Sequence, residues 1–131
     1  MATNLIFYLW VFAGGVIGSI LREFLAPFFP APVQWLPILV INTTAAVIIG
    51  FVYGIEQRLH HHLKTFYAVG FCGGFSTFSH FSYQTVRLME SGHALSATAN
   101  TVLSVGITLV AVWAGLGLAK RVYHNPLGSD S

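Results

Sequence analysis

The residues of this sequence best suited to chemistry are uncharged polar groups and aromatic rings set inside apolar segments. Asn42 lies near the middle of one segment, and Phe78 and Phe81 lie three residues apart in another. Small polar residues accompany the two rings: Ser76, Thr77, Ser79 and His80. An amide, hydroxyls and the positive edges of aromatic rings can each stabilise an anion without transferring a proton. This set of groups favours weak, numerous contacts with a small anion that has lost part of its water.

A structural interpretation stays open for each of these residues. The Asn42 amide could instead join two membrane helices by an interhelical hydrogen bond. Aromatic residues at helical spacing, here Phe75, Phe78 and Phe81, usually face lipid or pack in a core. However, the predicted membrane core contains no Asp or Glu, whereas a cation pathway commonly carries acidic side chains. The absence of acids favours an anion over a cation.

The composition indicates an integral membrane protein. Of 131 residues, 55% are hydrophobic and 8% are charged, and the mean hydropathy is +0.71. Soluble domains carry about 25% charged residues. The net charge of +2 is too small to indicate a nucleic-acid partner, and the single cysteine, Cys72, excludes an intrachain disulfide.

Four apolar segments approach the ~20 residues that span a bilayer. They are expected at about 4–26, 36–55, 66–89 and 94–122, with a proline-rich turn after the first, a polar loop at 56–64 and a tight turn at 90–93. We predict a single all-α membrane domain over residues 1–131. Because four short helices enclose little volume, a pathway through this protein would require an oligomer.

Glycines in the third segment predict a broken helix. Gly70, Gly73 and Gly74 each weaken a helix by about 1 kcal/mol relative to Ala. The hydroxyls of Ser76 and Thr77 can then bind the backbone groups that the break leaves unpaired. Unwound backbone at membrane depth is tolerated only where it is buried in protein or lines a wet cavity. We therefore predict a functional break in the middle of the third helix.

The first segment carries a second group of glycines and a basic end. Gly14, Gly15 and Gly18 lie along one side and predict close contact with another helix. Arg22 follows near the end of the segment. Such an arginine commonly extends to lipid headgroups, but it could also raise the anion concentration in a vestibule.

The basic residues specify orientation only weakly. Both termini are expected on one side of the membrane, where four basic residues oppose two on the other: Arg58, Lys64, Lys120 and Arg121 against Arg22 and Arg87. This slight bias favours cytoplasmic termini under the positive-inside rule. A chain that inserts in both orientations would show the same near-balance.

These residues resemble the Fluc/CrcB family of fluoride channels. The most specific match is the twelve-residue stretch 70–81, and Gly14–Gly18, Arg22, Asn42 and Gly50 add to it over essentially the whole chain. The resemblance implies an antiparallel, dual-topology dimer with two pores in a plasma membrane, exporting fluoride passively. The partner is expected to be a second copy of this chain or a related chain.

The resemblance also implies roles for individual residues. Phe78 and Phe81 match pore phenylalanines, and Asn42 matches a pore asparagine. The backbone carbonyls of Gly73 and Ser76 match ligands of a central structural Na⁺, a suitable role for unwound carbonyls.

Four further positions complete the comparison with the family pattern. Arg22 matches the arginine at the end of the first helix, next to the expected vestibule. His80 stands where threonine is usual, Gln84 where many members have a vestibule glutamate, and Ala45 where glycine is common. His80 places a titratable ring beside the pore phenylalanines.

Two other classes of function compete with a channel. A small multidrug-type exporter is also a four-helix dual-topology dimer, but it is expected to carry a membrane-embedded acid, and the first segment has none before Glu23. A non-transporting assembly subunit would use its glycines and phenylalanines only for packing. An enzyme is not indicated, because the sequence shows no evident nucleophile–base pair.

Overall fold

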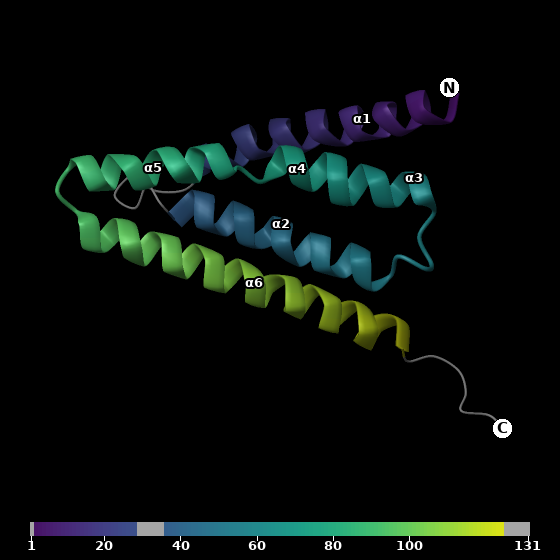
Figure 1. Cartoon of the computed structure of the whole chain (residues 1–131). Coiled ribbons are helices and arrows are strands. Elements are labelled where there is room, and N and C mark those ends of the chain that lie inside the picture. Colours follow the sequence, from purple (N-terminus) through teal and green to yellow (C-terminus); the bar gives the residue numbers. More distant parts are fainter. Residues whose placement is uncertain (1, 29–35, 125–131) are drawn as a thin grey trace.

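The computed structural model describes residues 2–28 and 36–124, which fold almost entirely into helices (Figure 1). The all-α prediction is confirmed. In chain order the elements are α1 (Ala2–Leu25), η1 (Ala26–Phe28), α2 (Leu36–Gly54), α3 (His61–Lys64), η2 (Thr65–Phe71), α4 (Cys72–Phe75), α5 (Phe78–Glu90) and α6 (Ala94–His124).

The four predicted membrane segments are present, one of them in pieces. Among the described residues, three helical stretches are long and apolar enough to cross a membrane: Ala2–Phe28, Leu36–Gly54 and Ala94–Tyr123. The third predicted segment, 66–89, is made of η2 and α4 in direct succession, followed by α5 after a two-residue interruption, and α3 leads into η2. The prediction of a broken third helix is therefore confirmed.

The break lies inside the predicted stretch 70–81, but the glycines themselves do not form it. Gly73 and Gly74 lie within α4, and Gly70 lies within the π-helical segment η2. The helix is interrupted at Ser76 and Thr77, whose backbones are extended, with φ/ψ of −76°/159° and −148°/110°. The interruption is held by side-chain hydrogen bonds, whereas Gly70 and Gly74 pack against α1 and Gly73 is open.

Glycines allow α1 to lie directly on the third segment. A Cβ added to Gly14 would collide with the Phe66 carbonyl oxygen, and one added to Gly18 would collide with that of Phe71. Gly74 is equally close to the backbone of Gly15. The predicted close contact of α1 with another helix is confirmed, and its partner is the stretch η2–α4.

A second glycine contact joins α2 to α6, which run side by side in Figure 1. Gly50 faces the Val112 carbonyl, and Gly115 faces that of Val47. A small buried cluster of Ile41, Ala45, Cys72 and Phe75 then connects α2 to α4. Ala45, which departs from the glycine expected from the resemblance, is 1% exposed, and its methyl group fills part of this core.

The connections between helices partly agree with the predictions. The tight turn at 90–93 is confirmed, and Gly92 occupies it at φ 81°, a conformation that favours glycine. The prediction of a loop at 56–64 was wrong for its second half, because His61–Lys64 form α3 and continue into η2. The ring of His62 stacks on Trp10 of α1 at 5.8 Å between centroids, which helps to order this turn.

The predicted proline-rich turn lies mostly outside the described residues, which do not include Pro30, Pro32 or Trp35. Pro27 lies in η1. Pro37 lies in the first turn of α2, where its missing N–H has no helical partner to lose.

The glycine contact between α2 and α6 generates a test of the packing. Gly115→Ala places a methyl group against the Val47 carbonyl and the Phe51 amide, whereas Gly117, two residues away, has no atom within 4 Å of an added Cβ. Overpacking of this kind costs about 1–3 kcal/mol. We expect Gly115→Ala to lower the thermal midpoint and the monodisperse yield, and Gly117→Ala to behave as wild type. Equal behaviour of the two variants in size-exclusion thermostability assays would contradict this packing.

Candidate functional site at the helix break

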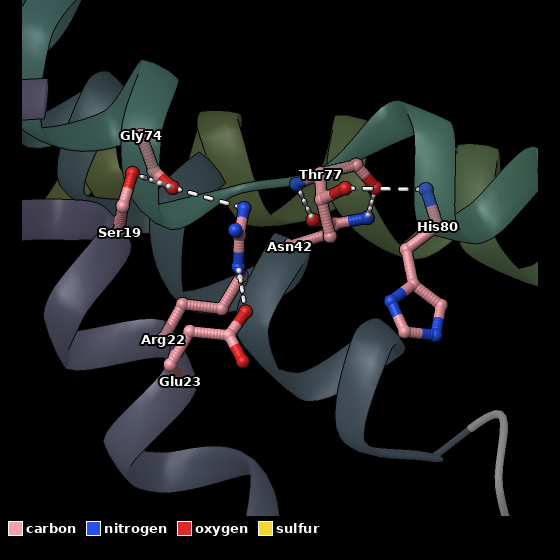
Figure 2. Close-up of polar contacts among 7 residues, drawn as sticks. All are labelled: Ser19, Arg22, Glu23, Asn42, Gly74, Thr77 and His80. Carbon is pink, nitrogen blue, oxygen red and sulfur yellow. Dashed lines mark hydrogen bonds and ion pairs between the residues drawn. The ribbon is translucent and has the colours of Figure 1, made fainter.

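A reciprocal pair of hydrogen bonds joins the break to α2. The Asn42 side-chain NH₂ group donates to the Thr77 carbonyl at 3.3 Å, and the Thr77 amide donates to Asn42 Oδ1 at 2.9 Å. Figure 2 shows the two residues facing each other. The alternative interpretation of Asn42, an interhelical hydrogen bond, is therefore present in the structure, whereas its role in an ion pathway stays a prediction.

Hydroxyl groups of the break bond to neighbouring backbone groups, and Thr77 does so as the sequence predicts, whereas the Cys72 carbonyl bound by Ser76 already accepts the Ser76 amide. The Ser76 hydroxyl donates to the Cys72 carbonyl at 2.7 Å. Thr77 is the N-cap of α5, and its Oγ1 accepts the His80 amide at 3.2 Å. Ser76 thus closes the end of α4, and Thr77 opens α5.

Arg22 is bound to the break rather than extended toward headgroups. Its Nη1 donates to the Gly74 carbonyl at 3.1 Å, and Ser19 Oγ donates to the same oxygen at 3.3 Å (Figure 2). Its Nε also pairs with Glu23 at 3.3 Å, and 26% of the Arg22 side chain is exposed. A cation at the C-terminal end of α4 is electrostatically favourable, since the last carbonyls of a helix carry partial negative charge.

The three phenylalanines of the third segment separate into two groups. Phe75 is 3% exposed and stacks on Phe71, with 5.5 Å between ring centroids. Phe78 is 79% exposed, and its ring lies 5.9 Å from that of the half-buried Phe81. Packing therefore explains Phe75, and the two rings after the break remain available to an ion or to a partner.

The other predicted pathway residues lie on α5, close to these rings. Ser79 and His80 are exposed, and Gln84 is half-buried, one turn beyond Phe81. In Figure 2 the His80 ring points away from Thr77, and it meets the Tyr83 ring edge-on at 6.4 Å. The structure therefore gathers the predicted pathway residues around one end of α5, but a single chain leaves several of them uncovered.

The two carbonyls expected to bind Na⁺ belong to residues at the end of α4. Gly73 is exposed, and an added Cβ would meet no atom within 4 Å. Ser76 follows it at the break itself. In the part of the chain that the structure describes, no group of three or more His, Cys, Asp or Glu side chains could hold a metal. Neutral carbonyl oxygens fit a hard monovalent cation better than a transition metal.

Comparison with known proteins places the chain in a family. A family model described as CrcB-like protein, Camphor Resistance (CrcB), matches residues 9–116. A fluoride-specific ion channel FluC of Ruegeria pomeroyi is 40% identical over 121 residues, which cover 92% of this chain and 89% of that protein. The chain belongs to the CrcB/FluC family.

Other organisms carry similar proteins of the same name. A fluoride-specific ion channel FluC of Rhodospirillum rubrum is 41% identical over 116 residues, covering 82% of this chain and 90% of that protein. A fluoride-specific ion channel FluC of Pyrococcus abyssi is 35% identical over 122 residues, which cover 90% of this chain and 99% of that protein. These CrcB/FluC relatives are ion channels rather than enzymes, and they match this chain over most of their length.

The CrcB/FluC match also spans a polar row on α6 that is not among the residues predicted from the sequence. Asn100, Ser104 and Thr108 recur every fourth residue, and therefore lie on one face of this apolar helix. Ser104 Oγ donates to Asn100 Oδ1 at 3.4 Å, and Thr108 Oγ1 donates to the Ser104 carbonyl at 2.7 Å. Asn100 also lines a cavity of about 160 Å³. The four-residue spacing was the signal that could have revealed this row.

Proposed function

We propose that this chain is a fluoride-selective channel that lets fluoride leave the cell passively across the plasma membrane. The observation that carries the proposal is the pair of accessible rings, Phe78 and Phe81, directly after a hydrogen-bonded break in a membrane helix. Membership in a family whose named relatives are fluoride-specific channels supports it. No chemical step is required, since an inside-negative potential favours anion exit by about 2.3 kcal/mol per 100 mV.

Loose binding by uncharged groups explains conduction without trapping. A dehydrated fluoride ion would meet the ring edges of Phe78 and Phe81, the hydroxyls of Thr77 and Ser79, and the Asn42 amide. Only one of the two Asn42 amide protons is needed for the Thr77 carbonyl. The His80 ring would line the same surface. Many weak contacts allow an ion to enter and to leave again.

The pathway is proposed to form between two antiparallel copies of the chain. Phe78 is 79% exposed, and Ser79 and His80 are exposed beside it, so one chain alone does not enclose a route. Two copies related by a two-fold axis would bury these groups on both chains and form two equivalent pores. The near-even distribution of Arg and Lys supports insertion in both orientations.

A structural Na⁺ at the centre of the dimer is proposed to be held by the carbonyls of Gly73 and Ser76. The exposed position of Gly73 supports this site, because its open face allows a second copy to approach. When bound, the cation would supply positive charge to the carbonyl oxygens of Gly73 and Ser76.

Arg22 and Gln84 are proposed to line the vestibule. The Arg22 guanidinium, tied to the Gly74 carbonyl, would attract anions toward the break. The polar row Asn100, Ser104 and Thr108 supplies further uncharged groups on α6 and would extend the hydrated part of the route.

The competing functions fit the described helices less well. The three described acids, Glu23, Glu56 and Glu90, lie at or just beyond helix ends, so a proton-coupled exporter would lack an embedded carboxylate. An assembly subunit would explain the exposed rings by packing alone. The two functions predict different results when the rings are removed: fluoride flux falls if the protein is a channel that uses the rings, and no such effect is expected if the rings only pack.

Substituting the two rings tests the pathway. Phe78→Ile or Phe81→Ile retains an apolar side chain but removes the ring edge, so we expect each to reduce fluoride efflux from liposomes severely, by about tenfold or more. Phe24→Ile on α1 is the matched control, since the Phe24 ring contacts Phe28 rather than the break. Near-wild-type flux in both test variants, with normal size-exclusion profiles, would return the rings to a packing role.

Accessibility labelling tests the dual topology. Gln57 is exposed in the connection between α2 and α3, whereas the native Cys72 is fully buried. We expect a membrane-impermeant maleimide to label about half of the Gln57→Cys protein from each side of the membrane. The wild-type chain, with only Cys72, is the control for background labelling. Labelling from one side alone would rule out dual insertion.

A further inference from the structure

The amides that would normally close the helix across the break are taken by side chains. In a continuous α-helix the Thr77 amide would bond to the Gly73 carbonyl, and the His80 amide to the Ser76 carbonyl. Here the Thr77 amide donates to Asn42 Oδ1 at 2.9 Å, and the His80 amide donates to Thr77 Oγ1 at 3.2 Å. The two diverted amides are therefore those that would otherwise occupy the Gly73 and Ser76 carbonyls.

We propose that Asn42 and Thr77 are positioning residues for the sodium site: their side chains hold these two amides and thereby leave the Gly73 and Ser76 carbonyls free to bind the cation. The proposal rests on the Na⁺ site of the proposed function. It gives Asn42 a task distinct from contacting fluoride, because Asn42 acts from α2 on the backbone of another segment.

The reciprocal geometry supports this role. Asn42 both accepts from the Thr77 amide and donates to the Thr77 carbonyl, so the extended peptide at Thr77 is held from both sides (Figure 2). Removing the Asn42 acceptor would free the Thr77 amide to return to Gly73. Loss of the Thr77 hydroxyl would likewise free the His80 amide to bond to the Ser76 carbonyl.

Thermal unfolding of the purified protein tests the proposal without a flux measurement. The midpoint is measured against Na⁺ concentration, with N-methylglucamine replacing Na⁺ at constant ionic strength. We expect Asn42→Ala and Thr77→Val to raise the Na⁺ concentration that gives half of the stabilisation by about 10- to 100-fold, as for other residues that orient metal ligands. Thr77→Ser, which retains the hydroxyl, should respond nearly as wild type.

Thr44→Ala is the matched control on α2. Its hydroxyl donates only to the Val40 carbonyl of the same helix, at 2.8 Å, and it is exposed. We expect this variant to keep the full response to Na⁺. Should Asn42→Ala fail to fold, the comparison of Thr77→Val with Thr77→Ser decides the question alone.

Two outcomes would overturn the inference, and they differ in what else they overturn. A wild type stabilised by Na⁺, with Asn42→Ala and Thr77→Val responding at the same Na⁺ concentration, would leave the sodium site in place but remove the positioning role. A wild type whose midpoint does not depend on Na⁺ would overturn the sodium site itself, and the positioning role with it.

Discussion

The paired hydrogen bonds between Asn42 and Thr77 are the interaction on which the rest of the site depends. Backbone groups left without partners at membrane depth cost several kcal/mol each, so an interrupted helix needs a substitute for every lost bond. Asn42 supplies two of these substitutes from a neighbouring helix. From within the break, the Thr77 hydroxyl supplies an acceptor for the His80 amide, and the Ser76 hydroxyl adds a second donor to the Cys72 carbonyl. A new helix, α5, can begin at Phe78 because these bonds stabilise the interruption.

Glycine packing determines what else reaches the break. Since Gly14 and Gly18 allow α1 to lie against η2 and α4, Ser19 and Arg22 come within hydrogen-bonding distance of the Gly74 carbonyl. Arg22 therefore brings positive charge to the point where the backbone is unwound, partly offset by Glu23. The same packing brings residues of α1 next to the proposed pathway, although both rings of the predicted pair lie on α5.

Much of this arrangement was predictable from local sequence. Hydrophobic length predicted four membrane segments, and the small residues of α1 predicted close helix contact. The position of the break was not predictable from the glycines, because glycine in a membrane helix serves packing as readily as interruption. The interruption instead depends on Asn42, 35 residues away in the chain, and such a tertiary bond leaves no local pattern. The different environments of Phe75 and Phe78 follow from the same cause, since the break separates one ring from the other.

The central claim is that copies of this chain, with no other polypeptide, conduct fluoride selectively. The most direct measurement is ion efflux from liposomes that contain only the purified protein, with fluoride and chloride each followed by an ion-selective electrode. The account predicts rapid fluoride efflux and little chloride efflux, because uncharged ring edges, hydroxyls and one amide form the route. Equal rates for the two anions, or no efflux of either above protein-free liposomes, would contradict it.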